Sequence, residues 1–68
     1  MFITDAMPNN GQFVALWFTS EGLPFSATLK WEDGQLKSYN NVNDLWEYEC
    51  DHGYSRKFFE SRDANFYR

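Results

Sequence analysis

The chain has 68 residues, a net charge of −4 at neutral pH, a single cysteine and an aromatic content of 21%. This length allows one small domain, spanning residues 1–68, and such a chain buries only roughly 60% of its unfolded surface. One cysteine excludes an internal disulfide, and the acidic balance argues against non-specific binding to nucleic acid or to anionic lipid.

The core therefore has to come from aromatic side chains. The chain carries seven Phe, four Tyr and three Trp, and each ring buries roughly 150–250 Å². The N-terminal residues show no signal peptide, and no apolar run approaches the roughly 20 residues of a membrane span. We expect a soluble, cytoplasmic protein that makes no membrane contact.

Residues 1–10 are predicted to be a lead-in to the fold. Phe2 and Ile3 are available for packing, and a turn runs from Pro8 to Gly11. Residues 13–18 form the first predicted strand. All six are apolar, which is typical of a central strand covered on both faces.

Residues 25–31 form the second predicted strand, because apolar and polar residues alternate along it. The apolar face consists of Phe25, Ala27, Leu29 and Trp31.

Asp33-Gly34 is the strongest hairpin signal in the chain. A two-residue loop at this point places Trp31 opposite Leu36, which favours this register, and Lys30 opposite Lys37, which opposes it because like charges repel. A three-residue loop with a bulge stays open as the alternative.

Residues 45–50 alternate again and predict a fourth strand, beside the third or the first. Trp46, Tyr48 and Cys50 share one face, and Glu47, Glu49 and Asp51 share the other. Beside the third strand, these acids would lie near Lys30 and Lys37 and relieve their repulsion.

The tail after Gly53 is predicted to be a short helix packed over the first strand, with Ser55 as its N-cap. Its periodicity comes from Tyr54, Phe58, Arg62 and Phe66, which recur every four residues. A short strand over residues 57–60 is the alternative.

Together these elements predict an α+β fold: an antiparallel meander of three to four strands with a short C-terminal helix. A small all-β barrel is the alternative architecture.

Cys50, Asp51 and His52 bring a thiol, a carboxylate and an imidazole together in sequence. The paired-ligand spacing of a metal site is missing, and a nucleophilic Cys–His pair also needs an oxyanion hole. We interpret them as a core thiol and a turn histidine, and we expect no enzymatic activity, no metal and no cofactor.

The sequence instead favours a binding protein with an acidic and aromatic surface. Its aromatic residues exceed the needs of one small core, and exposed Trp and Tyr beside charges are typical of protein interfaces. A row of carboxylates also imitates a nucleic-acid backbone. The candidate partner-binding residues are Tyr39, Glu47, Glu49, Asp51, Arg56 and Lys57. A homodimer is a further way to cover surplus aromatics.

The alternative function is binding of single-stranded nucleic acid by the exposed aromatics and the cations Arg56, Lys57 and Arg62. The net charge makes nucleic acid the less favoured partner.

The first half of the chain carries Phe2-Ile3, a Met-Pro-Asn-Asn-Gly-Gln-Phe-Val segment at residues 7–14, Gly22, and Trp31-Glu32-Asp33-Gly34. With these motifs it resembles a family of short uncharacterised phage and prophage proteins. The resemblance implies a phage origin, and hence a bacterial host protein as the partner that this chain modulates or inhibits. It implies no particular functional residue.

Overall fold

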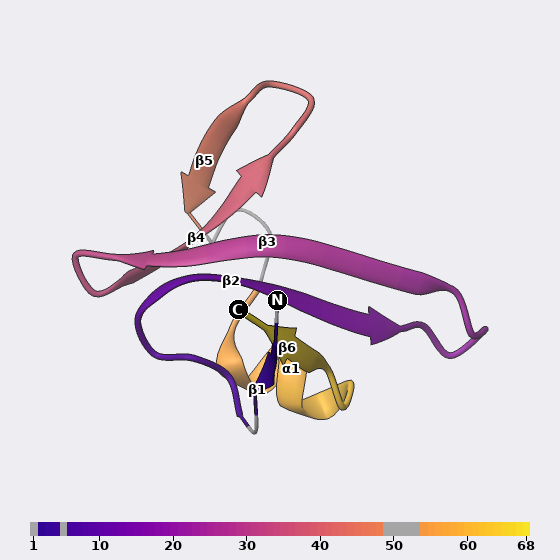
Figure 1. Cartoon of the computed structure of the whole chain (residues 1–68). Coiled ribbons are helices and arrows are strands. Elements are labelled where there is room, and N and C mark those ends of the chain that lie inside the picture. Colours follow the sequence, from indigo (N-terminus) through magenta and orange to yellow (C-terminus); the bar gives the residue numbers. More distant parts are fainter. Residues whose placement is uncertain (1, 5, 49–53) are drawn as a thin grey trace.

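The structure is a computed structural model that describes residues 2–4, 6–48 and 54–68. These residues form a six-stranded antiparallel sheet and one short helix (Figure 1), with the strands in the order β1-β6-β2-β3-β4-β5. The elements are β1 (Ile3–Thr4), β2 (Gly11–Phe18), β3 (Pro24–Glu32), β4 (Gln35–Asn40), β5 (Leu45–Tyr48), α1 (Arg56–Ser61) and β6 (Asn65–Tyr67).

The α+β class and the antiparallel meander are confirmed, and the sheet is larger than predicted. Strands β2 to β5 follow each other as neighbours, so β5 lies beside β4. β1 and β5 are the two edges, so the described strands do not close into a barrel. In Figure 1 the β4–β5 hairpin stands away from the long β2–β3 pair.

The turn at Asp33-Gly34 has the predicted two-residue loop. Trp31 lies opposite Leu36 and Lys30 lies opposite Lys37. The φ angles of Asp33 and Gly34 are 55° and 75°, as a type I′ hairpin turn requires at both central positions. The backbone preference of this dipeptide therefore prevails over the repulsion between the two lysines.

The predicted C-terminal helix is confirmed and is short. The Ser55 hydroxyl accepts a hydrogen bond from the backbone N–H of Phe58 at 3.1 Å, which caps the first turn. Two bonds close the other end, from Ala64 N–H to the Phe59 carbonyl at 3.1 Å and from Asp63 N–H to the Glu60 carbonyl at 3.2 Å. This pair of bonds is a Schellman motif, which ends the helix.

The chain beyond the helix returns to the sheet, contrary to the predicted four-residue periodicity. Phe66 lies in β6, which pairs with β2 on one side and with β1 on the other. The lead-in prediction was also wrong in part, since Ile3 pairs with Tyr67. Both predictions failed because β1 and β6, with two and three residues, are too short to show a period in the sequence. Their pairing also joins opposite ends of the chain, which no local pattern reveals.

The core lies between the sheet and α1. It consists of Met7, Phe13, Ala15, Trp17, Leu29, Leu36, Phe59 and Phe66. Phe59 is fully buried, with ring centroids 5.4 Å from Trp17 and 5.8 Å from Phe66. The helix therefore covers β2 on one face, as predicted.

The expectation that β2 is covered on both faces was wrong. Val14 and Leu16 point away from α1 and are only half-buried, and Phe18 is 56% exposed. Along residues 13–18, every second residue therefore points into the core, and the residues between them point to the opposite face of the sheet.

Candidate binding surface

The face of the sheet opposite α1 is the main surface that the fold leaves uncovered, and we call it the open face. In the part of the chain that the structure describes, no helix or second sheet packs over it. The strand registers assign to it Ile3, Gln12, Val14, Leu16, Phe18, Ser26, Thr28, Lys30, Glu32, Gln35, Lys37, Tyr39, Trp46, Asn65 and Tyr67.

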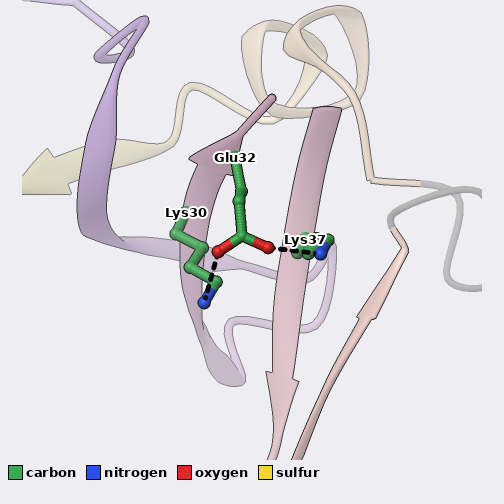
Figure 2. A network of polar contacts seen from close by, with 3 residues as sticks. All are labelled: Lys30, Glu32 and Lys37. Atoms are coloured by element: carbon green, nitrogen blue, oxygen red, sulfur yellow. Dashed lines mark hydrogen bonds and ion pairs between the residues drawn. The ribbon is translucent and has the colours of Figure 1, made fainter. Parts of the chain in front are cut away.

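Charges on the open face are organised around Glu32 (Figure 2). Its carboxylate lies between two ammonium groups, 2.6 Å from Lys37 Nζ and 3.3 Å from Lys30 Nζ. These hydrogen bonds and charges hold the pKa of the Glu32 carboxyl below its ordinary value. The carboxylate between them offsets the repulsion of the two opposed lysines.

Aromatic side chains flank this network. Lys30 Nζ lies 4.3 Å from the centroid of the Trp46 ring, a cation–π contact. The rings of Tyr39 and Trp46 meet edge-to-face with centroids 5.3 Å apart. The Tyr39 hydroxyl donates a hydrogen bond to the Asp44 carboxylate. That bond, with desolvation and the charge of Asp44, raises the pKa of Tyr39.

Glu47 does not lie beside these lysines, contrary to the expectation from the sequence. It pairs with Ser38, whereas Lys37 pairs with Tyr48, so Glu47 and Lys37 point to opposite faces of the β4–β5 hairpin. The Glu47 carboxylate accepts a hydrogen bond from the Asn40 amide at 3.1 Å. Tyr39 and Glu47 therefore belong to different surfaces of the hairpin.

The described acids between residues 30 and 48 do not form a row that would imitate a nucleic-acid backbone. Glu32 is paired with two lysines, Asp33 and Asp44 occupy turn positions with positive φ, and Glu47 faces the other side of the sheet. The predicted acidic residues Glu49 and Asp51 lie outside the described residues, as do Cys50 and His52.

The basic residues of the tail mostly contact the protein itself. Arg56 donates to the Met7 carbonyl at 3.3 Å. Arg62 lies over the Phe58 ring, and Arg68 donates to Asn10. Lys57 is exposed on α1. The structure therefore does not gather these cations into a groove with the open-face aromatics.

Lys30, Glu32 and Trp46 also belong to this surface and are not among the candidate partner-binding residues predicted from the sequence. A signal for two of them was present, since Lys30 and Glu32 are two positions apart and so share a face of a strand. The position of Trp46 over Lys30 depends on the order β3-β4-β5 and was not visible in the sequence.

Because the pKa of Glu32 is lower in the folded state than its ordinary 4.5, the ionised carboxylate stabilises the fold. This contribution is complete above the ordinary value and is lost as the pH falls through the folded-state pKa. We expect Glu32→Gln to reduce the slope of stability against pH in this acid range. Urea unfolding across the range measures the slope.

Glu21→Gln is the matched control, since Glu21 is an exposed carboxylate in the β2–β3 loop and makes no ion pair with a described residue. A carbon-13 titration of the Glu32 carboxyl that gives a pKa at or above 4.5 would contradict the network.

No described group of three or more His, Cys, Asp or Glu residues has the arrangement of a metal site. No helix in the described part of the chain has the length and apolar character needed to cross a membrane.

Comparison with known proteins finds no match among family models, curated proteins or solved structures. The resemblance to phage proteins therefore stays a prediction.

Proposed function

We propose that this chain is a non-enzymatic binding protein that docks on another protein through its open face and blocks or alters that partner. The observation that carries the proposal is the Lys30–Trp46–Tyr39 cluster, in which aromatic rings and a cation lie in contact on an uncovered sheet face. The resemblance of the first half to phage proteins favours a bacterial host protein as the partner.

The composition of the open face supports a protein partner. Trp and Tyr are enriched where protein interfaces carry most of their binding energy, because they bury a large area with few rotatable bonds. Val14 and Leu16 add half-buried apolar surface on the central strand, and Phe18 and Ile3 add exposed apolar surface toward the ends. Each of the charges at Lys30, Glu32 and Lys37 has a partner of opposite sign and the three sum to +1, so docking does not bury an unpaired charge.

The test is affinity capture from bacterial lysate with quantitative mass spectrometry, comparing the wild type with Trp46→Ala. Truncation of an aromatic anchor at the centre of an interface weakens binding by about tenfold or more. We expect at least one protein to be captured by the wild type and lost with this variant.

Val42→Ala is the matched control, because Val42 is 88% exposed in the loop of the same hairpin and lies outside the strands that build the open face. Capture profiles that do not differ between wild type and Trp46→Ala would refute the proposal. Association with a second copy is the competing use of this face, and sedimentation of the purified chain separates the two.

A further inference from the structure

A second candidate site lies where the β2–β3 loop meets the C-terminal end of α1. A recess of about 480 Å³ is present there. Its lining residues are Trp17, Phe18, Thr19, Ser20, Ser61 and Arg62. They combine an aromatic wall, three hydroxyl-bearing residues and one guanidinium group. Phe18 is shared with the open face, but none of them belongs to the Lys30–Trp46–Tyr39 cluster that carries the proposed function, so the site stands without that proposal.

Arg62 is held in place before any ligand arrives. Its guanidinium carbon lies 3.8 Å from the centroid of the Phe58 ring. Its Nη1 donates to the Phe58 carbonyl at 3.3 Å and to the Ser61 hydroxyl at 3.1 Å. A guanidinium fixed by stacking and hydrogen bonds loses little freedom when it binds an anion.

The positive charge of Arg62 is not neutralised within the described chain. Arg62 forms no ion pair with any described residue, and its Nε and Nη2 groups make no hydrogen bond there. The neighbouring acids Glu60 and Asp63 line a different recess, on the side of α1 that faces Met7. The protein has a net charge of −4, yet this recess presents a cation and no carboxylate.

Apolar side chains continue the site beyond Arg62. The Phe58 ring meets Trp17 edge-to-face at 5.8 Å, and Trp17 stacks on Phe25 with centroids 6.3 Å apart. Phe25 and Leu23 are 50% and 54% exposed. A partner at this end of the molecule therefore meets a cation and an apolar aromatic wall side by side.

We propose that this recess binds a peptide segment of a protein partner in which an acidic side chain flanks an apolar one. The carboxylate pairs with the free edge of the Arg62 guanidinium, where two parallel N–H···O bonds form. The apolar side chain packs on the exposed Phe25, whose ring stacks on the buried Trp17, and the exposed Leu23 extends the contact. Exposed apolar residues around such a recess suit a peptide, which covers them, better than a small free acid.

The test uses two capped tripeptides, Glu-Phe-Glu and its neutral analogue Gln-Phe-Gln, titrated at millimolar concentration into the nitrogen-15 labelled protein. The acidic peptide is expected to shift the Trp17 indole, Thr19 and Ser20 resonances. Because Arg62 is exposed, the affinity of the acidic peptide should exceed that of the neutral peptide by up to about fivefold, the upper size for an ion pair with good geometry at an exposed site. Equal affinities would overturn the proposal.

Two variants assign the preference to Arg62. With Arg62→Gln the two peptides are expected to bind within about twofold of each other, since the remaining exposed charges contribute little. Lys57→Gln removes the same charge from α1 outside the recess and should retain the preference. If Arg62→Gln does not fold, Arg62→Lys keeps the charge, loses the planar fork and should lose most of the preference.

Persistence of the full preference in either Arg62 variant would refute the site. Hydrocinnamate, a small carboxylate with a phenyl group, tests whether the recess binds a small free acid instead of a peptide. Binding of hydrocinnamate at the same resonances with the affinity of the acidic peptide would overturn the assignment to a peptide.

Discussion

Replacing Phe59 with alanine is expected to remove about a third or more of the stability of the fold. Phe59 is fully buried, and its ring contacts those of Trp17, Tyr54, Phe58 and Phe66. Loss of a buried Phe costs about 3–5 kcal/mol, through lost apolar burial and the cavity left behind. A domain of this size has a total stability of about 3–10 kcal/mol.

Urea unfolding followed by tryptophan fluorescence measures the loss. Phe2→Ala is the matched control, because Phe2 is 82% exposed and its described hydrogen bonds are through the backbone to Arg68. Phe59→Leu should cost less than about 1.5 kcal/mol, since it largely keeps the volume. A midpoint for Phe59→Ala equal to that of Phe2→Ala would mean that α1 does not close the core.

Replacing Gly11 with alanine is expected to destabilise the fold by about 2 kcal/mol. Gly11 has a φ of +69°, where a side chain costs about 1–2 kcal/mol. An added Cβ would also lie 2.9 Å from Nη2 of Arg68. That nitrogen donates to the Asn10 carbonyl and side chain at 3.1 and 2.9 Å, so the substitution displaces a contact between the two ends of the chain.

Gly22→Ala separates the two causes. Gly22 has a similar φ of +82°, with no atom within 4 Å of an added Cβ. Its substitution should show the backbone cost alone. Gly11→Ala should destabilise the fold by up to about 1 kcal/mol more than Gly22→Ala. This additional loss should disappear when both substitutions are made in the Arg68→Ala variant and measured by thermal unfolding. An additional loss that persists in that variant would exclude Arg68 as its cause.

Local signals predicted the meander, and the structure confirms them. The Asp33-Gly34 dipeptide sets the register of β3 and β4 through its backbone conformation. The alternation along residues 25–31 identifies the face that carries the buried Leu29. Ser55 marks the start of α1. Each of these depends on interactions within a few residues, and such interactions are readable from one sequence.

The candidate surface was predicted less well. Tyr39 and Glu47 were both predicted to bind a partner, but only Tyr39 lies on the open face. Residues along a strand alternate between its two faces, and the register of β5 against β4 decides which face each residue takes. The cation–π contact between Lys30 and Trp46 joins β3 to β5 across an intervening strand.

The sequence alone thus determined the aromatic core, the hairpin turns and the capped helix, because propensity, turn chemistry and alternation act over short distances. Only the tertiary structure decided that residues 3–4 and 65–67 extend the sheet, that β2 is covered on one face, and that Glu32 pairs with two opposed lysines. These features arise from pairing between residues distant in sequence. Which distant segments pair depends on the entropy of loop closure and on competition between alternative packings. Neither can be read from a local sequence pattern.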